Sequence, residues 1–421
     1  MPIRIFPALR AVALALTAFG VVCADEAADD RLTVADLVAA ARAHHPALRV
    51  ADADAAVARA EADQAARWPD PELNLSAGVA RARDGGGRAT VGAVELRQPI
   101  DWPAQRRGRR GAAVAGSAAS AARHALAALE VEAEVREAAH DLMHQREGVT
   151  LARESEAIVT RLVPLVAARV AAGENPRADL LRVQVEAERA AQATAERVNG
   201  ADAAAARLRA ATGLAIDGER PRLDDLHAHA LDRGALIAAT ARHPRLALAE
   251  SALRSAEARI GRADAARWPQ AAVGGYLERG DDTDDAGLAL SLTLPLWDGG
   301  RGEAAIARAA LARARAELEV ERAAVARDLE VAWLAYRAAG ERAERLTGRI
   351  APAAQEALRL AMRAYEAGET GLIDIVDVRR TAQEARAAAA DAAHEVHGAA
   401  IHAQHAAGSF LADATTPGDQ P

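Results

Sequence analysis

The sequence repeats one pattern after about 200 residues. This offset is too long for a solenoid repeat, which runs roughly 20–50 residues, so each copy must be a unit of several helices or strands. We expect a first structural repeat over 25–212, a linker over 213–234 and a second repeat over 235–410. The matches that carry this reading keep the same order in both copies: His45-Pro46 with His243-Pro244, Trp68-Pro69 with Trp268-Pro269, and Ala172-Gly173-Glu174 with Ala367-Gly368-Glu369.

The first residues have the features of a secretory signal peptide. Arg4 and Arg10 are followed by an apolar run over 11–22 and then by Ala24 and acidic residues. The run is shorter than the ~20 residues that a spanning helix needs, which favours cleavage of 1–24 over a retained anchor. Cys23 is the only cysteine, and its lipidation stays an alternative. Residues 411–421 are expected to be a disordered tail.

The composition is typical of long helices. Hydrophobic residues make up 51% of the chain but aromatic residues only 3%, and lysine is absent. The net charge of −8 speaks against nucleic-acid binding, which needs a basic face. Pro164 is expected to kink or interrupt the helix that contains it. The segments with a helical pattern are 33–67, 102–172, 175–211, 235–267, 301–367 and 372–411.

Four shorter segments instead alternate between apolar and polar residues. They cover about 71–83, 88–100, 270–279 and 286–296, and each pair is joined by a very polar turn. Alternation over about ten residues is the pattern of membrane β-strands. Half-buried hairpins of a water-soluble domain are the alternative. Two such pairs, at matching places of a duplicated and exported chain, favour membrane strands over the hairpins of a water-soluble domain.

Tryptophans flank these strands. Trp68, Trp102, Trp268 and Trp297 lie at the predicted junctions between strand and helix. Tryptophan favours the membrane–water interface, so we expect these residues to contact lipid. Four strands cannot close a barrel, and open strand edges cannot face lipid. The chain is therefore expected to oligomerise, and three copies would supply a closable set of twelve strands.

Several motifs together resemble the TolC-type family of outer-membrane efflux channels. The segments 173–181 and 365–377 are similar to the family's two helix-turn tips, and 291–302 is similar to its second passage from strand to helix. The segment 96–102, followed by the arginine-rich 106–110, resembles the subgroup that serves heavy-metal pumps of the resistance-nodulation-division (RND) type.

The resemblance implies a mainly α protein with membrane β-structure. Its fold would be a homotrimer with a twelve-stranded outer-membrane β-barrel, continued by a long periplasmic α-helical barrel. Its function would be to conduct cargo passively from the periplasm to the exterior, through a gate at an acidic periplasmic constriction, with divalent heavy-metal cations as the cargo. The partners would be a periplasmic membrane-fusion adaptor, an inner-membrane RND pump and the outer-membrane lipid around the barrel. Drug efflux, type I protein secretion and a periplasmic coiled-coil structural or adaptor protein remain the alternatives.

The resemblance also implies functional residues at the periplasmic end. Asp374 and Asp377 match the family's acidic constriction, and their spacing places them on one helical face. Asp179 matches an aspartate that holds the closed state, but Thr370 stands where the family prototype has its basic partner, so Arg177 or Arg182 is the expected substitute. Solvated helix carboxylates are the alternative for these acidic residues. The expected adaptor-docking tips are Gly173, Glu174, Gly368 and Glu369.

Histidines raise the question of a metal site. His140 and His144 are one helical turn apart, and four more lie at 394, 397, 402 and 405. Surface or interhelical histidines are the simpler interpretation, so no metal site and no cofactor are predicted. The sequence also lacks hydrolase, zinc-protease and phosphate-loop motifs, so we do not expect an enzyme.

Overall fold

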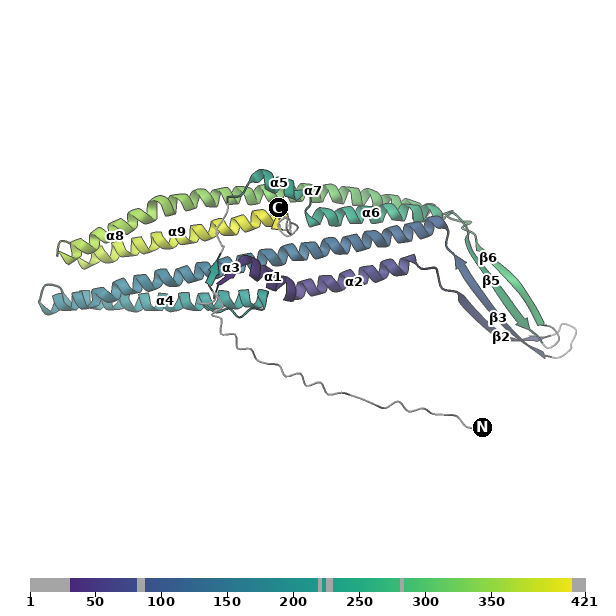
Figure 1. The fold of residues 1–421 in the computed structure, drawn as a ribbon, viewed down its shortest axis with the longest axis horizontal. Helices are drawn as coiled ribbons and strands as arrows, with labels where there is room; N and C mark the ends of the chain where they lie inside the picture. The colour runs from purple at the N-terminus through teal and green to yellow at the C-terminus, as the bar shows by residue number, and fades with distance from the viewer. Residues whose placement is uncertain (1–30, 82–87, 219–221, 225–229, 281–283, 411–421) are drawn as a thin grey trace, which may run out of the picture.

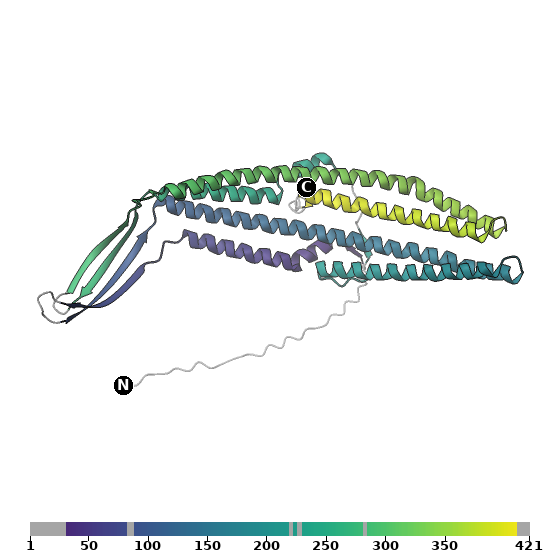
Figure 2. The same cartoon turned by 180° about the vertical axis from the view of Figure 1, so that it is seen from behind.

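A computed structural model describes residues 31–81, 88–218, 222–224, 230–280 and 284–410. The predicted signal peptide with Cys23 and the predicted C-terminal tail lie outside these residues. The molecule is elongated, with helices running along its length and a β-sheet at one end (Figure 1). The view from behind shows the tips of both helical hairpins together at the opposite end (Figure 2).

The described chain is mostly helical, and its elements recur in the same order in both halves. The first half contains β1 (Arg31–Thr33), α1 (Val34–His44), α2 (Pro46–Ala66), β2 (Glu72–Arg81), β3 (Arg88–Ile100), α3 (Pro103–Ala171) and α4 (Arg177–Thr212). The second contains β4 (Arg222–Asp224), α5 (Arg233–Thr240), α6 (Pro244–Ala265), β5 (Gln270–Arg279), β6 (Asp284–Thr293), α7 (Arg301–Arg345), the π-helical turn η1 (Leu346–Ile350), α8 (Ala351–Glu366) and α9 (Leu372–Ala407).

The repeated His-Pro pairs begin matching helices. The Nδ1 atom of His45 accepts a hydrogen bond from the Ala47 amide at 3.3 Å, and Nδ1 of His243 accepts one from the Arg245 amide at 3.2 Å. The proline that follows each histidine is the first helical residue, where its missing N–H costs nothing. The matching helices α2 and α6 therefore begin with the same histidine cap and the same proline.

The helix α3 is the longest element of the described chain. Its 69 residues span about 100 Å at 1.5 Å per residue. Of the two outcomes expected at Pro164, a kink or an interruption, the interruption does not occur, because the helix continues through this residue. Leu162 and Val166, on either side, are buried against the other helices, and this packing offsets the hydrogen bond that proline cannot make. The matching run 301–367 is divided by η1, which the sequence analysis did not predict.

None of the helices in the described ranges is both long and apolar enough to cross a membrane. The helical part is held together by thin clusters of small and aliphatic side chains. One cluster near the middle joins α1, α3 and α4, and includes Leu37, Val135 and Leu208. At the same level the parallel pair β1–β4 connects the two repeats.

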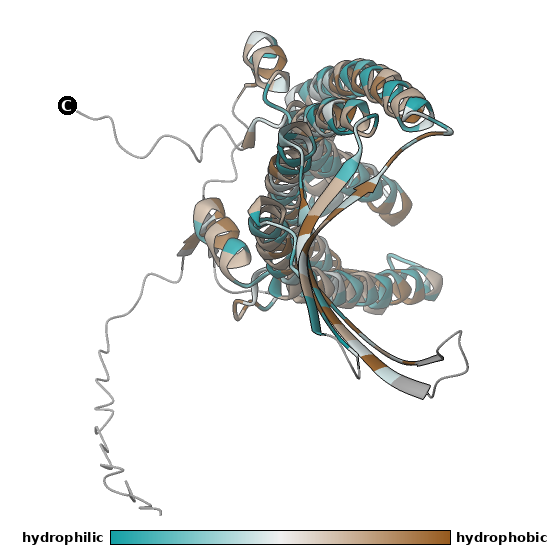
Figure 3. Cartoon of the chain, turned by 90° about the vertical axis from the view of Figure 1, so that its right-hand side faces the viewer, coloured by the Kyte–Doolittle hydropathy of each residue, from teal (hydrophilic) through white to brown (hydrophobic). Residues whose placement is uncertain are grey.

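The sheet has the strand order β2-β3-β5-β6, and neighbouring strands are antiparallel. Strand β6 ends at Thr293, before the predicted 296, because Pro295 has no N–H to donate to a ladder. Apolar residues recur along the strands (Figure 3), and the strand register places them on one face of the sheet. On this face, the exposed fractions of Leu75, Leu277 and Leu290 are 70%, 62% and 65%.

The opposite face of the sheet is polar. It carries Glu72 and Arg97, which are paired across β2 and β3 at 2.6 Å. The outer strands β2 and β6 each have one neighbour in the sheet, so each presents a free edge. A sheet with an exposed apolar face and two free edges is incomplete as a single chain in water.

Candidate functional site at the helical tips

The two helical tips are built alike. Gly173 and Gly368 adopt left-handed conformations with φ of 79° and 80°, which favour glycine because a Cβ is strained there. Around Gly173, its amide and that of Glu174 donate to carbonyls three and five residues earlier, at 3.1 and 2.9 Å. Gly368 and Glu369 repeat this pattern at 3.0 and 2.8 Å. All four residues are exposed, as docking requires, although their docking role stays a prediction.

The two hairpins are joined by one apolar cluster just behind the tips. On top of it, the Arg169 guanidinium of α3 lies 4.5 Å from the centre of the Tyr365 ring and donates to the Tyr365 carbonyl at 2.8 Å. Burial raises the pKa of the Tyr365 phenol, Arg169 lowers it, and Asp179 raises it further. The phenol is therefore neutral at physiological pH. The cluster draws on α3, α4, α8 and α9: Val159, Leu162, Val166, Val183, Tyr365, Leu372 and Ile375.

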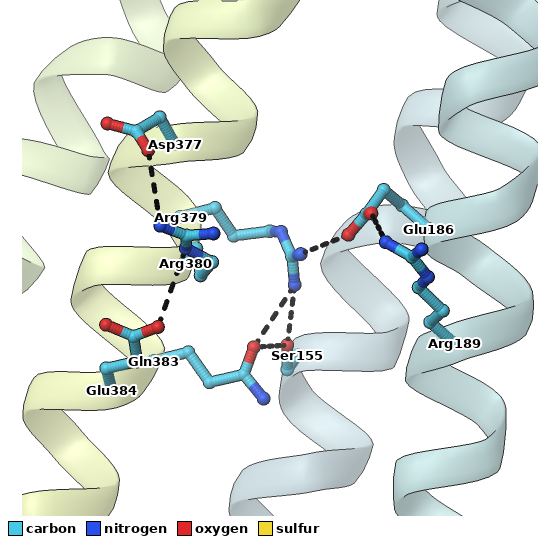
Figure 4. A network of polar contacts seen from close by, with 8 residues as sticks. All are labelled: Ser155, Glu186, Arg189, Asp377, Arg379, Arg380, Gln383 and Glu384. Carbon is cyan, nitrogen blue, oxygen red and sulfur yellow. Dashed lines mark hydrogen bonds and ion pairs between the residues drawn. The ribbon is translucent and has the colours of Figure 1, made fainter.

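A buried arginine joins the hairpins about two turns further along (Figure 4). Arg379 of α9 is 6% exposed. Its Nη2 donates to Glu186 Oε2 of α4 at 3.2 Å, and its Nη1 donates to Ser155 Oγ of α3 at 3.0 Å. Nη1 also donates to Gln383 Oε1 at 3.2 Å, and the Ser155 hydroxyl donates to the same oxygen at 2.8 Å. Three helices thus meet on one guanidinium.

The Arg379 network was missed by the sequence analysis. A signal was present, because Arg379 continues the buried stripe of α9 formed by Leu372, Ile375 and Ala382. Burial lowers the pKa of Arg379, while Glu186 raises it, and arginine remains charged at neutral pH. A charge at such a position needs partners from the neighbouring helices.

The predicted constriction residues lie on the solvent side of α9. Asp374 is exposed in the first helical turn, and its Oδ2 accepts a hydrogen bond from the Gly371 amide at 3.4 Å. Asp377 is exposed on the next turn, with Oδ1 3.9 Å from Nη2 of Arg380. A groove between α4 and α9 runs past Asp377, lined by Leu181, Val185, Ile373, Arg380 and others. The Asp377 carboxylate therefore lies beside the positively charged guanidinium of Arg380.

Asp179 makes its contacts within the first hairpin. Its Oδ2 accepts a hydrogen bond from Asn175 Nδ2 at 3.0 Å, and its Oδ1 lies 3.7 Å from Nη1 of Arg182. Arg177 is exposed at the first residue of α4. The Thr370 Oγ1 is buried without a hydrogen-bond partner among the described residues. The structure brings Asp179 and Arg182 together, but on one helix rather than across the hairpins.

The four predicted interface tryptophans all lie where helices meet the sheet. Trp297 is 98% exposed, and Trp68 and Trp268 are more than half exposed, at 57% and 56%. Trp102 is partly buried, and its Nε1 donates to the Pro269 carbonyl at 2.5 Å. This bond ties the first repeat to the second at the base of the sheet.

The comparisons with known proteins place the chain in a family. A family profile described as outer membrane efflux protein matches residues 37–214 and again 236–409. The chain belongs to this family. The two matched ranges correspond to the two halves in which the helices and strands recur. The search of curated proteins found no match to the chain. The sequence-based resemblance is confirmed at the level of this family, and the heavy-metal subgroup remains a proposal.

This outer membrane efflux protein is similar in fold to solved outer-membrane channels. A membrane protein from Pseudomonas aeruginosa is 22% identical, with a TM-score of 0.78 and coverage of 89% of this chain and 90% of that chain. The open state of the Neisseria gonorrhoeae MtrE outer membrane channel is 22% identical (TM-score 0.74, coverage 89% and 88%). The Campylobacter jejuni CmeC outer membrane channel is 16% identical (TM-score 0.74, coverage 89% and 85%).

Membership of the outer membrane efflux proteins decides between the classes of function that the sequence left open. The family consists of outer-membrane channels rather than enzymes. Membership of this family also argues against a periplasmic coiled-coil structural or adaptor protein, an alternative that did not account for the sheet. Within the described ranges, no group of three or more His, Cys, Asp or Glu side chains is arranged to hold a metal ion.

Proposed function

We propose that the chain is one protomer of a homotrimeric channel that conducts cargo from the periplasm to the cell exterior. It would act in a tripartite system with a periplasmic adaptor and an inner-membrane RND pump. The observation that carries this proposal is the sheet. Its apolar face is exposed, its other face is polar, and both outer strands have free edges. Three copies joined edge to edge remove every free edge and make a twelve-stranded barrel with lipid outside and water inside.

The helices extend this barrel into the periplasm. With α3 about 100 Å long, the tips lie far from the membrane, within reach of an adaptor. Gly173, Glu174, Gly368 and Glu369 are the proposed contacts, because they are exposed and end both hairpins. The tryptophans at the base of the sheet would mark the inner boundary of the bilayer.

The gate would lie at the tips. In a trimer, Asp374 and Asp377 supply two rings of three carboxylates, which attract cations. Arg380 beside Asp377 moderates this charge at the second ring. The pair of Asp179 and Arg182, with Arg177 nearby, would order the first hairpin. Arg379 would hold α9 against α3 and α4 and so favour the closed arrangement of the tips.

Divalent heavy-metal cations are the proposed cargo. Support comes from the segment 96–102 with the arginines of 106–110, which resembles the heavy-metal subgroup, and from the acidic rings. A conduit needs only weak binding, so a strong metal site is not required along the path. Drug efflux and type I protein secretion are the competing roles of the same channel.

The cargo can be tested in the bacterium that carries the gene. A deletion strain, made in a background that lacks other efflux channels, is grown on Zn, Co, Cd, Ni and Cu salts and on a panel of drugs. Sensitivity limited to certain cations, restored by the wild-type gene, supports the proposal. Sensitivity to drugs alone refutes metal export and leaves a general efflux channel. Normal growth with loss of a secreted protein indicates type I secretion instead.

A further inference from the structure

Four histidines form two stacked pairs between α3 and α9. The His140 and His397 rings lie 4.6 Å apart with planes inclined by 22°, and the His144 and His394 rings lie 4.4 Å apart at 12°. We name these four residues the histidine ladder. It lies about 40 Å from the first tip, counted along α3. Because α3 belongs to the first repeat and α9 to the second, the ladder lies at a seam between the repeats.

The ladder is partly buried but reachable by protons. All four histidines are of intermediate exposure, and a surface groove is lined by His140 and His394 together with Glu134, Glu137, Asp141 and His402. The pKa of His140 is lowered to about 4, mainly by burial and also by His397, His394 and Arg136. Burial also lowers the pKa of His394, as does His144, whereas Asp141 and Asp391 raise it.

The charges around the ladder are unevenly placed. Asp391 of α9 lies 3.1 Å from His144 Nε2, so one layer has a carboxylate beside its imidazoles. Asp141 of α3 is already paired with Arg207 of α4 at 2.6 Å. The other layer faces Arg136 of α3, which disfavours a further positive charge. Further out, Glu137 lies 3.4 Å from His402, and Glu395 of α9 is paired with Arg342 of α7 at 2.8 Å.

We propose that the histidine ladder is a pH-responsive joint that holds the two repeats together when its imidazoles are neutral and loosens α3 from α9 when they gain protons. Neutral rings stack without repulsion, whereas two protonated rings at this spacing repel each other in a poorly solvated seam. The joint would make the helical tube sensitive to the acidity of its surroundings. This property is independent of the cargo and of the acidic rings at the tips.

The direction and size of the effect follow from linkage. A histidine with a lowered pKa in the packed state favours packing above its ordinary value of 6.5, and this contribution is lost as the pH falls from 6.5 toward about 4. Between pH 7.5 and 5.5, His140 alone predicts a rise of as much as about tenfold in the ratio of loosened to packed seam. Below pH 4 the contribution no longer changes.

Hydrogen–deuterium exchange of the full-length trimer in lipid nanodiscs tests the joint. Exchange is compared at pH 7.5 and 5.5 after correction for the intrinsic pH dependence. The wild type is expected to lose protection around 390–400 at pH 5.5, and the double variant His140→Gln with His394→Gln is expected to lose this pH response. His124→Gln, outside the ladder on α3, is the control and keeps the wild-type response. Equal wild-type protection at both pH values, or an unchanged response in the double variant, overturns the proposal.

A second variant keeps the test valid if the double variant does not fold. Asp391→Asn removes a carboxylate that lies 3.1 Å from His144 and raises the pKa of His394. Without it the pKa of His394 in the packed seam falls further below its ordinary value, so the loosening should begin at higher pH than in the wild type. A purely structural role of Asp391 would instead lower protection equally at both pH values. That result, with no shift of the pH profile, also contradicts the proposal.

Discussion

Replacing Arg379 by methionine is predicted to weaken the closure of the tips. The methionine fills much of the space of the arginine stem, so the change mainly removes the polar contacts. The two contacts that leave α9 are those to Glu186 on α4, at 3.2 Å, and to Ser155 on α3, at 3.0 Å. The third, to Gln383, stays within α9 and does not join helices.

The magnitude follows from these two contacts. Hydrogen bonds to charged groups contribute about 1.5–3 kcal/mol each. The lower end applies, because Glu186 keeps a second partner in Arg189 at 3.0 Å and its side chain is 24% exposed. The loss is therefore about 3 kcal/mol per protomer, which changes the ratio of closed to open tips about 100-fold. Lysine at the same position keeps the charge but not both contacts, and is expected to restore closure only in part.

Closure can be measured by conductance and by leakage. Purified Arg379→Met trimers in planar bilayers should conduct more and close less often than the wild type. Cells that express the variant without its adaptor should become sensitive to a large antibiotic that an intact outer membrane excludes. Arg359→Met is the control, because Arg359 is exposed on α8, pairs with Glu356 of the same helix and lies outside the buried network. Conductance and sensitivity equal to those of the wild type in Arg379→Met would refute the role assigned to this residue.

Three further predictions concern other parts of the molecule. Gly368→Ala forces a Cβ into a left-handed conformation at about 1–2 kcal/mol and should weaken the adaptor complex in pull-down assays, whereas an unchanged complex would count against docking at this tip. Leu290→Arg on the apolar face should cost about 2–4 kcal/mol and reduce heat-resistant trimer in outer-membrane fractions, while Ser291→Arg on the polar face should not; equal losses would contradict the assignment of faces. Asp374→Asn with Asp377→Asn should lower the cation-to-anion permeability ratio in bilayers, and an unchanged reversal potential would exclude a selective role.

The sequence predicted the architecture because its signals are local and occur twice. Alternation defined the strands, and the repeated Gly-Glu pairs marked the turns between long helices. The division of 33–67 at His45 and of 235–267 at His243 into two helices each was not predicted. The helix is not interrupted at Pro164, because tertiary packing outweighs local propensity there. The π turn η1 has no clear signature in the sequence, since a widened helical turn needs no special residue.

The candidate site was less predictable because its contacts join distant segments. Ser155, Glu186 and Arg379 are 31 to 224 residues apart in sequence, and pattern reasoning within one helix does not bring them together. Arg379 alone could have been noticed, as a charge on an apolar stripe. The stacking of His140 on His397 likewise depends on the register between α3 and α9, which the sequence does not specify.

Disulfide trapping between the outer strands tests the central claim, that three chains close one barrel. Cys23 is the only natural cysteine, and Ser76 on β2 and Ser291 on β6 both lie on the polar face. Three strand spacings, about 14 Å, separate β2 from β6 within one chain, so a disulfide between them must join different chains. We predict that a scan of cysteine pairs around Ser76 and Ser291 gives covalent trimers in outer-membrane fractions under non-reducing conditions. Monomers alone throughout the scan, or dimers without trimers, would contradict the account.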